Sequence, residues 1–359
     1  MQSLWVKKDE LVQTQWREGD APVPGDGQIL LAIEKYALTA NNITYAVVGD
    51  GFGYWNFFPA GDDRWGIVPV WGFATVVASG HADIAVGERV YGYLPMASHL
   101  LVTPVNVQDG GFVDGAAHRQ GLAIIYNQYH RLGTDESPRE AERAIFQPLF
   151  TTSFLIEHFM RSNDWFGAEA LVVTSASSKT ALGLAMVVKN LSPEIRRIGL
   201  TSADNKAFVE ETGLYDEVLV YHHLASADAG RATVSVDFAG NGPLLAEIHA
   251  HWGDNLKFSS LVGATHVEQR GGAADLQGPK PELFFAPTAA ETLMKEIGPA
   301  AFRARVDEQF AAFVESASGY LAIEDLTGTE ALRSAYLAML ANEIAPRRGL
   351  MCHFAHGRA

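Results

Sequence analysis

The first third of the chain alternates apolar and polar residues in short runs, which is the pattern of β-strands with one buried face. Three such stretches are GQILLAIEKYAL from Gly27, VPVWGFATVVASG from Val68 and GERVYGYLPMASHLLVTP from Gly87. Because Gly and Pro separate the runs, they predict a small β-barrel. An aromatic loop, GDGFGYWNFFPAGDD from Gly49, separates the first two stretches. We expect this loop either to pack on the barrel or to line a pocket.

From about Ser137 the apolar residues recur with the period of a helix, and after Ala168 short apolar strands alternate with helical stretches. Buried strands joined by crossover helices predict a parallel, doubly wound sheet. After Pro287 the pattern is helical again, and RGLMCHFA from Arg348 predicts a strand that returns to the barrel. The apolar strands are ALVVTS, RRIGLTS, EVLVY, TVSVDFAG and LKFSSLVGAT.

These patterns predict an α/β protein with two domains. A Rossmann-type, doubly wound parallel sheet is expected for residues 141–291, where a dinucleotide would bind. A smaller β-barrel domain, which would carry substrate binding and catalysis, is expected for residues 1–140 and 292–359. A chain of 359 residues, of which 48% are hydrophobic, is long enough for two buried cores.

Charge and cysteine content narrow the class of partner. The net charge is -15 and no basic cluster is present, so we expect no binding to nucleic acid. No apolar run approaches the roughly 20 residues that span a bilayer, and the first residues lack a signal-peptide pattern. We therefore expect a cytoplasmic protein that binds no membrane. The single cysteine, Cys352, cannot form an internal disulfide, which fits a reducing compartment.

The order of these elements resembles the medium-chain dehydrogenase/reductase superfamily over nearly the whole chain. Within it, the sequence is similar to the zinc-free quinone and enoyl reductases. The resemblance implies a GroES-like barrel, a nicotinamide cofactor and a homo-oligomer such as a homodimer. The stretch from His118 to Phe150, which includes IIYNQYHRLG, departs from the common pattern of the superfamily.

The turn after the first predicted Rossmann strand, in VVTSASSKTALGLA from Val172, contains no glycine. Zinc-free reductases usually have Gly-Ala-Ser-Gly-Gly-Val-Gly there, and glycines let the backbone approach phosphates. Hydroxyls and an ammonium group can instead donate to phosphate oxygens at the positive end of the following helix. We therefore predict that the three serines, the lysine and the threonine of this turn bind the cofactor. The matching positions are Ser175, Ala176, Ser177, Ser178, Lys179, Thr180 and Ala181.

A P-loop and a turn without a ligand are the alternatives to cofactor binding. A P-loop would also contain Ser-Lys-Thr, but it requires glycines where Val173 and Ser178 stand, so we reject it. The remaining alternative is a Rossmann-like turn that has lost its ligand, in which Ser177 is only the N-cap of the helix.

The end of the second Rossmann strand, GLTSADNK, indicates which dinucleotide binds. Folds that prefer NAD place a carboxylate there for the ribose 2′-hydroxyl. Here the strand ends in Thr201 and Ser202, and Asp204 comes only at the start of the next helix. Ser202 and Asn205, with Lys206 and Lys179, can donate to a 2′-phosphate. The sequence therefore predicts NADP as the cofactor.

Three further segments are candidates for the nicotinamide end of the cofactor, by resemblance. DFAGNG around Gly240 and LVGAT around Val262 and Gly263 match the superfamily's loops near the nicotinamide, although both could be ordinary turns at strand ends. In PELFFAP, Phe284 and Phe285 either border the nicotinamide or cap the sheet.

The residues that bind zinc in related dehydrogenases are missing. Those enzymes carry a cysteine after the early strand and a Gly-His-Glu motif in the barrel. Here the corresponding positions are Ala37 and the run Gly72, Phe73 and Ala74, none of which can be a zinc ligand. The paired histidines at 222–223 and at 249 and 251 have spacings that suit no shared ligand, and we expect them on the surface. We predict that no metal is bound.

Without a metal, hydrogen-bond donors must polarise the substrate. TANNITYAVVGD resembles the segment of zinc-free reductases that carries an asparagine and, later, a tyrosine. Asn41, Asn42 and Tyr45 are therefore candidate catalytic residues, and Tyr54 in the aromatic loop is the next. The alternative for Tyr45 is a core aromatic residue with a satisfied hydroxyl.

The sequence thus favours a zinc-independent, NADPH-dependent reductase. It would transfer hydride to an activated C=C or C=O of a small hydrophobic substrate of the quinone, enone or enoyl type. Tyr126 and Tyr129, in the unusual insertion, are further candidates near the substrate. The missing glycines also favour an alternative, a non-catalytic NADPH-binding sensor or scaffold protein.

Overall fold

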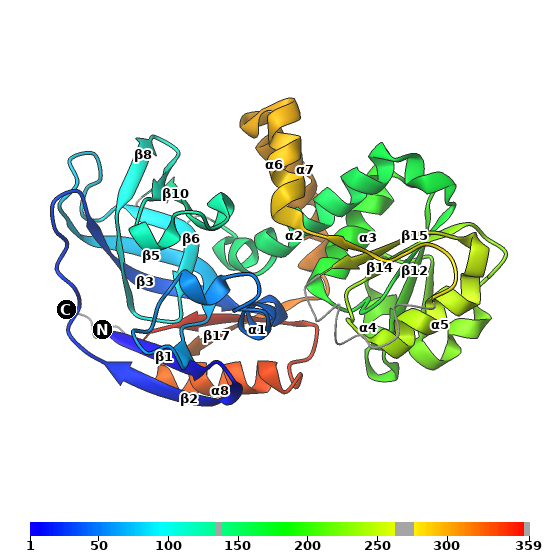
Figure 1. The fold of residues 1–359 in the computed structure, drawn as a ribbon, viewed down its shortest axis with the longest axis horizontal. Coiled ribbons are helices and arrows are strands. Elements are labelled where there is room, and N and C mark those ends of the chain that lie inside the picture. The colour runs from blue at the N-terminus through cyan, green and yellow to red at the C-terminus, as the bar shows by residue number, and fades with distance from the viewer. Residues whose placement is uncertain (134–137, 263–275, 355–359) are drawn as a thin grey trace. The chain divides into compact units, whose positions relative to one another are not determined.

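The computed structural model describes residues 1–133, 138–262 and 276–354 and contains two compact units (Figure 1). A mostly antiparallel sheet forms the core of one unit and a parallel sheet forms the core of the other. The predicted α/β fold class, with a doubly wound parallel sheet and a separate antiparallel domain, is therefore confirmed. None of the helices in the described part of the chain has the length and apolarity needed to cross a membrane.

Unit 1 consists of Met1–Ile145 and Ile323–Ala359, and unit 2 of Phe146–Ala322. The sequence places the first boundary slightly earlier, after residue 140. The second predicted boundary, between residues 291 and 292, falls inside helix α6 (Ala286–Ile297), whereas unit 2 continues to Ala322. Helical periodicity alone gave no signal for which of the two units this stretch joins.

Unit 1 is built on a nine-stranded sheet with the order β17-β18-β3-β5-β6-β10-β9-β8, in which β7 also pairs with β3. A separate three-stranded sheet has the order β2-β1-β4. The strands of the large sheet are β3 (Ile29–Leu38), β5 (Pro69–Ser79), β6 (Arg89–Pro95), β7 (His99–Val102), β8 (Pro104–Gln108), β9 (Gly111–Asp114), β10 (Gln128–Leu132), β17 (Ala322–Thr327) and β18 (Arg348–His353). The small sheet contains β1 (Gln2–Lys7), β2 (Glu10–Glu18) and β4 (Trp65–Gly66).

The central pair of this large sheet is β3 with β5. Their approach is so close that a Cβ atom at Gly72 would lie 2.3 Å from the carbonyl oxygen of Lys35, so only glycine fits there. On its other side β3 pairs with β18, in register Met351 with Ala37. The predicted return of the C-terminal strand is thus observed, with helix α8 (Thr329–Leu340) just before it.

Helix α1 (Ala40–Val47) follows β3 and is fixed by Asn42. The Asn42 side-chain oxygen accepts from the backbone N–H of Thr39 at 2.7 Å, which completes a capping box. The amide nitrogen of Asn42 donates to the carbonyl of Pro69 at 2.9 Å. Asn42 therefore holds α1 against the start of β5.

The unusual insertion forms two short 3-10 helices, Ala117–Arg119 and Ile124–Tyr126, before β10. Arg119 is 1% exposed, and its Nε lies 3.2 Å from the carboxylate of Asp114. Its guanidinium carbon also lies 4.7 Å from the ring centroid of Phe58, in the aromatic loop. A buried, paired cation thus anchors the insertion to that loop.

Unit 2 is a six-stranded parallel sheet with the order β13-β12-β11-β14-β15-β16. Its strands are β11 (Ala170–Val173), β12 (Arg196–Thr201), β13 (Glu217–Val220), β14 (Thr233–Asp237), β15 (Leu256–Val262) and β16 (Glu282–Phe284). Helix α2 (Glu140–Ser162) begins in unit 1 and belongs to unit 2 from Phe146 onward. The other helices of unit 2 are α3 (Lys179–Leu191), α4 (Ala203–Glu211), α5 (Gly242–Trp252), α6 and α7 (Pro299–Ala317). The order reverses beside β11, as in doubly wound folds.

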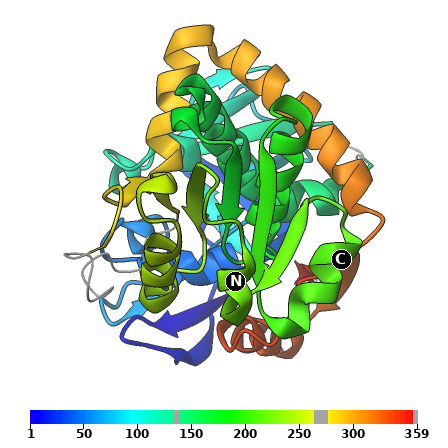
Figure 2. The ribbon, with the colours of Figure 1, turned by 90° about the vertical axis from the view of Figure 1, so that its right-hand side faces the viewer.

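Both faces of this sheet are covered by helices, as Figure 2 shows for the green and yellow strands. Leu171 and Val173 of β11 pack in one core with residues of α2 and α3. Ala170 and Val172, which point the other way, pack in a second core with residues of α5. This explains why β11 is apolar at every position rather than at alternate ones.

The expectation that His249 lies on the surface is wrong. His249 is fully buried on α5, with Nε2 3.0 Å from the hydroxyl oxygen of Ser259 and Nδ1 2.7 Å from the carbonyl of Gln277. The spacing of two residues correctly predicted that His249 and His251 lie on different faces of the helix. It could not show that the face with His249 is buried against the rest of unit 2.

Candidate functional sites

The turn without glycine, between β11 and α3, keeps the backbone of a glycine turn. Ser175 has a φ of 48°, in the left-handed region that glycine adopts most readily. The Oγ of Ser178 accepts from the backbone N–H of Ala181 at 3.3 Å, so the N-cap of α3 is Ser178. The alternative in which Ser177 is that N-cap is wrong, because the helix begins one residue later.

Contacts from neighbouring strands fix the shape of this turn. The backbone N–H of Ala176 donates to the carbonyl of Leu200 at 3.0 Å. The Tyr215 hydroxyl donates to the carbonyl of Ala176 at 3.1 Å. A Cβ atom at Gly199, in β12, would lie 3.0 Å from Cβ of Ala176, so the close approach depends on a glycine in the neighbouring strand.

Thr174 joins this turn to the loop after β14. Its hydroxyl donates to Asp237 Oδ1 at 2.7 Å and accepts from the backbone N–H groups of Phe238 at 2.9 Å and Ala239 at 3.0 Å. Gly240 follows with a φ of 64°. The two loops that flank the reversal of strand order are therefore held together, where doubly wound folds bind their ligands.

The candidates for the 2′-phosphate lie beside the turn. The side-chain nitrogen of Asn205 donates to the Ser177 hydroxyl oxygen at 3.2 Å. Ser202 begins α4 as its N-cap without a side-chain capping bond. Lys206 lies 3.0 Å from Glu210 in an ion pair on α4. The structure thus brings Asn205 to the predicted turn and pairs Lys206 elsewhere.

Lys179 is the first residue of α3 and is half-buried. Burial lowers the pKa of its ammonium group to about 8. Burial removes water from the ammonium group and so disfavours its charged form. An anion beside Lys179 would stabilise the charged form and raise the pKa again. Lys179 and Thr180 lie in the first turn of α3, where a helix favours negative charge.

The other predicted cofactor residues also follow strands at the carboxyl edge of the same parallel sheet. Val262 is the last residue of β15, and Phe285, which is 36% exposed, follows β16. Gly263 lies outside the described residues.

In unit 1, the Tyr45 hydroxyl is the centre of a hydrogen-bonded group. Its oxygen accepts from the side-chain amide of Asn41 at 2.7 Å and from the indole N–H of Trp71 at 3.2 Å. Tyr45 is 4% exposed, whereas Asn41 and Trp71 are half-buried. The alternative prediction of a core aromatic residue with a satisfied hydroxyl therefore describes its surroundings correctly.

Tyr54 and Tyr126 complete this group. Their hydroxyl oxygens lie 3.2 Å apart, although the residues come from the aromatic loop and the insertion. The ring of Tyr45 lies 4.6 Å from that of Tyr54 and 6.1 Å from that of Tyr126, between centroids. We call Asn41, Tyr45, Tyr54, Trp71 and Tyr126 the tyrosine cluster.

Burial raises the pKa of every phenol in the tyrosine cluster. The pKa of Tyr45 is raised above 10 by burial and by Tyr54, while hydrogen bonds with Trp71, Asn41 and Tyr126 lower it. Burial raises the pKa of Tyr126 and, to a lesser degree, that of Tyr54. These phenols are therefore protonated near neutral pH and act as donors.

Sequence reasoning missed Trp71 and included one tyrosine that has another role. Trp71 is paired with Tyr93 across β5 and β6, and the sequence pattern does not give the register that makes this cross-strand aromatic pair. Tyr129 donates its hydroxyl to the carbonyl of Tyr93 at 2.7 Å and accepts from Arg119, so it anchors the insertion and lies outside the cluster.

The positions that correspond to zinc ligands are buried in the sheet. Ala37 is 2% exposed and Phe73 and Ala74 are fully buried. Among the described residues, no group of three or more His, Cys, Asp or Glu side chains is arranged to hold a metal ion.

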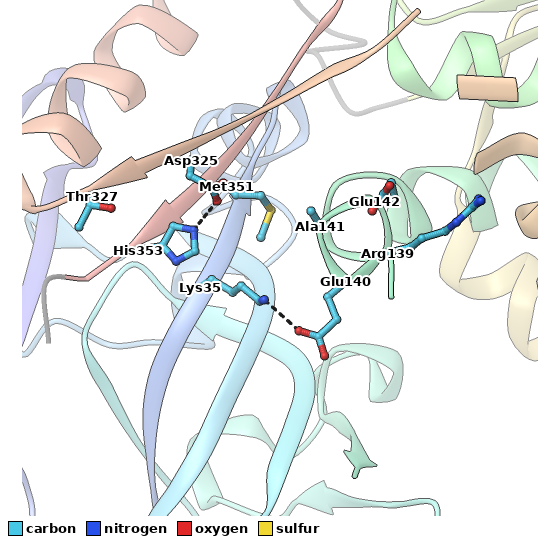
Figure 3. Close-up of a pocket in the computed structure, with 9 residues that line it drawn as sticks. All are labelled: Lys35, Arg139, Glu140, Ala141, Glu142, Asp325, Thr327, Met351 and His353. Carbon is cyan, nitrogen blue, oxygen red and sulfur yellow. Dashed lines mark hydrogen bonds and ion pairs between the residues drawn. The ribbon is translucent and has the colours of Figure 1, made fainter. Parts of the chain in front are cut away.

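A pocket of about 520 Å³ in unit 1 contains none of the predicted site residues (Figure 3). In its lining, Lys35 forms an ion pair with Glu140 at 3.0 Å, and Arg89 pairs with the same carboxylate at 2.8 Å. His353 is hydrogen-bonded to Asp325 at 2.6 Å. Because these charges are paired within the protein, we assign no substrate to this pocket.

Three solved structures share the fold of this chain over almost its whole length. CurA from Vibrio vulnificus in complex with NADPH is 14% identical, covers 99% of this chain and 100% of that chain, and has a TM-score of 0.62. CurK enoyl reductase is 12% identical, with coverages of 98% and 99% and a TM-score of 0.57. The yhdH oxidoreductase from Salmonella enterica in complex with NADP is 13% identical, with coverages of 98% and 99% and a TM-score of 0.54.

At these identities the likeness shows the fold alone, and this two-domain fold is the one that the resemblance to medium-chain reductases implies. No curated protein matches the sequence. A family profile described as "Protein of unknown function (DUF2855)" matches residues 36–345, which is most of the chain. The chain therefore belongs to this family.

Proposed function

We propose that this protein is an NADPH-dependent, zinc-independent reductase of an activated C=C or C=O in a small hydrophobic substrate. The observation that carries the proposal is the turn after β11. It keeps a left-handed residue at Ser175 and a capped helix start at Ser178, beside the reversal of strand order. Two of the similar structures were solved with NADPH or NADP, which supports the same cofactor here.

The residues of unit 2 fit a dinucleotide phosphate. The hydroxyl groups of the turn and the Lys179 ammonium can donate to the pyrophosphate, in place of the backbone approach that glycines give. Ser202 and Asn205 supply neutral donors for a 2′-phosphate, and no carboxylate ends β12. When bound, NADPH supplies the hydride.

In unit 1, the tyrosine cluster supplies the hydrogen-bond donors. A phenol that donates to the substrate carbonyl stabilises the negative charge that develops on oxygen during hydride addition. The aromatic rings around it favour an apolar substrate of the quinone, enone or enoyl type. The resemblance to medium-chain reductases also leads us to propose a homo-oligomer, which light scattering of the purified protein would test, and a cytoplasmic location, which cell fractionation would test.

The test is to measure binding of NADPH and NADH and then oxidation of NADPH with a panel of quinones, enones and enoyl thioesters. We expect tighter binding of NADPH than of NADH, and turnover with at least one class. Equal affinities would refute the 2′-phosphate assignment. If neither cofactor binds, the whole proposal is refuted.

A second candidate function is a non-catalytic NADPH sensor, and the internal hydrogen bonds of the tyrosine cluster favour it. The Tyr45 hydroxyl accepts from Asn41 and Trp71, and the hydroxyl oxygens of Tyr54 and Tyr126 lie 3.2 Å apart, so these groups have partners within the protein. Tight NADPH binding without turnover on the whole panel would support the sensor and exclude the reductase.

A further inference from the structure

We propose that Tyr215 is a positioning residue of the cofactor turn, which is the segment 174–178 between β11 and α3. Its hydroxyl orients the peptide group between Ala176 and Ser177, so that the N–H of Ser177 is presented to a phosphate group. The identity of the ligand, a dinucleotide phosphate, rests on the proposed function. The positioning itself rests on the geometry of unit 2 alone.

The backbone of the cofactor turn is one that its own residues do not favour. Ser175 is left-handed, with a φ of 48°, and a residue with a side chain adopts this region less readily than glycine does. Within the turn, the N–H of Ser178 donates to the carbonyl of Ser175 at 2.8 Å. This bond closes the turn, but the two peptide groups on either side of Ala176 must be oriented by contacts from other elements.

Two such contacts reach Ala176, which is fully buried. Its N–H donates to the carbonyl of Leu200 in β12 at 3.0 Å, and its carbonyl accepts from the Tyr215 hydroxyl at 3.1 Å. The N–H belongs to the peptide group that directly follows Ser175, and the carbonyl belongs to the next peptide group. The strand therefore fixes the first peptide group, and Tyr215 fixes the second.

The orientation of the second peptide group decides where the Ser177 N–H points. A trans peptide group carries its C=O and its N–H on opposite sides, and none of the described peptide bonds is cis. Because the carbonyl of Ala176 points at the Tyr215 hydroxyl, the N–H of Ser177 points away from it. In the described part of the chain this N–H donates to no protein acceptor.

An N–H group without a protein acceptor in this place suits an anionic ligand. Ser177 is 9% exposed, and backbone N–H groups that are this enclosed are nearly always hydrogen-bonded. The group lies one residue before the N-cap of α3, a helix of 13 residues, where the helix dipole favours negative charge. A phosphate oxygen of a dinucleotide would supply the acceptor.

The Tyr215 ring can reach the turn because β12 has a glycine at the point of contact. A Cβ atom at Gly199 would lie 3.0 Å from Cδ1 of Tyr215 and also 3.0 Å from Cβ of Ala176. A side chain there would displace either the ring or the turn. The close approach that a glycine of the turn would permit is thus permitted by a glycine of the neighbouring strand.

The residues on both sides of Tyr215 are held by Arg197 of β12. The Arg197 Nε donates to the carbonyl of Leu214 at 3.0 Å, and its Nη2 lies 2.8 Å from the carboxylate of Asp216. The backbone N–H of Arg197 donates to the same carboxylate at 2.7 Å. Because its neighbours are tied to the strand, Tyr215 offers its hydroxyl to the turn from a fixed position.

The first test is the affinity for NADPH, measured by isothermal titration. Tyr215→Phe should weaken binding about tenfold, as for one lost hydrogen bond, and raise the KM for NADPH with kcat at saturating NADPH unchanged. Tyr336→Phe is the matched control, because the Tyr336 hydroxyl also donates to a backbone carbonyl at 3.1 Å, that of Leu11 in unit 1. It should leave the affinity unchanged.

A second substitution separates positioning from a general structural defect. Ser175→Gly gives the turn the freedom that a left-handed residue needs, so the Tyr215 hydroxyl should matter less in that background. Tyr215→Phe should then weaken NADPH binding only about threefold or less. A tenfold loss that persists in the Ser175→Gly background would overturn the inference, because the loss would not arise from the turn.

The Ser177 amide gives a readout that needs no turnover. Labelling with ¹³C at the alanine carbonyl and ¹⁵N at serine selects the amides of the five Ala-Ser steps in the chain, and Ser177→Ala identifies the signal of Ser177. NADPH should move this amide proton downfield, as expected for a new hydrogen bond to phosphate. Tyr215→Phe should shift the same amide in the unliganded protein, and Tyr336→Phe should not.

The outcomes keep this inference apart from the proposed function. If NADPH does not bind the wild type, the proposed function fails, and the Ser177 amide of unliganded Tyr215→Phe alone decides whether Tyr215 orients the peptide group. If NADPH binds without moving the Ser177 amide, the inference is overturned and the proposed cofactor stands. Wild-type NADPH affinity in Tyr215→Phe would overturn it as well.

Discussion

Ser175 shows at the scale of one residue how a turn can do without glycine. Its left-handed backbone costs about 1 kcal/mol or more relative to glycine, and the contacts of Ala176 with Leu200 and Tyr215 hold the turn against that cost. We expect Ser175→Gly to leave the free energy of unfolding unchanged or to raise it. Ser175→Val should lower it by about 1–2 kcal/mol, because β-branched residues tolerate this conformation poorly. Urea unfolding of both variants measures the difference, and equal stabilities would contradict the argument.

Lys179 gives the cofactor site a predictable pH dependence. Its pKa of about 8 means that the ammonium is charged below that pH and neutral above it. The affinity for NADPH should therefore fall as the pH rises through about 8, and Lys179→Ala should remove most of this dependence. At neutral pH the substitution should weaken binding by about 1–3 kcal/mol, typical of a lost charge-assisted hydrogen bond. Isothermal titration across this range tests both statements. A wild-type affinity that does not change with pH would exclude Lys179 from phosphate binding.

Tyr45 is the residue for which the sequence suggested the chemistry and the structure defined the neighbours. Tyr45→Phe keeps the ring and removes the hydroxyl that Asn41 and Trp71 contact. We expect turnover to fall about a hundredfold, as for loss of an oxyanion-stabilising donor, with NADPH affinity nearly unchanged. Steady-state kinetics and a binding titration measure the two quantities. If Tyr45→Phe retains full turnover and Tyr54→Phe does not, the donor was assigned to the wrong phenol.

At the scale of elements, the apolar run of β11 predicted a strand covered on both faces, and the two cores around it are observed. Trp71 was beyond reach of the same reasoning. It comes to Tyr45 because β5 pairs with β3 in the sheet and α1 directly follows β3, an arrangement that local periodicity does not encode. The contact between Tyr54 and Tyr126 likewise joins two loops 72 residues apart.

Helix α5 carries a pH-dependent contribution to stability through His249. Burial lowers the pKa of His249 below 6.5, so the unfolded chain binds the proton more readily. The stabilisation is therefore complete above about pH 6.5, near the unfolded pKa, and is lost as the pH falls below it. Chemical unfolding at a series of pH values should show this acid-side loss reduced in His249→Gln. His251→Gln is the control on the same helix, and an equal reduction there would contradict the assignment.

At the scale of the molecule, the alternation of strand and helix patterns was enough to predict a parallel sheet and a separate antiparallel one. The boundary near residue 292 was not accessible in this way, because α6 and α7 have the same helical period whichever unit they join. The cofactor loops could be placed at one edge of the sheet because parallel strands share a carboxyl edge. The tyrosine cluster depended on tertiary contacts that only the structure provides.

The whole-molecule prediction concerns metal. By the resemblance, Ala37, Phe73 and Ala74 correspond to the zinc ligands of zinc-dependent dehydrogenases, and all three are packed inside the sheet of unit 1. A catalytic zinc needs three protein ligands, and apolar side chains cannot supply them. Reductase activity should therefore persist after exhaustive dialysis against a chelator, and added zinc should not raise it. Elemental analysis of the purified, active protein provides the independent check. Stoichiometric zinc, or turnover that chelation abolishes and zinc restores, would show that the donors are not the tyrosine hydroxyls alone.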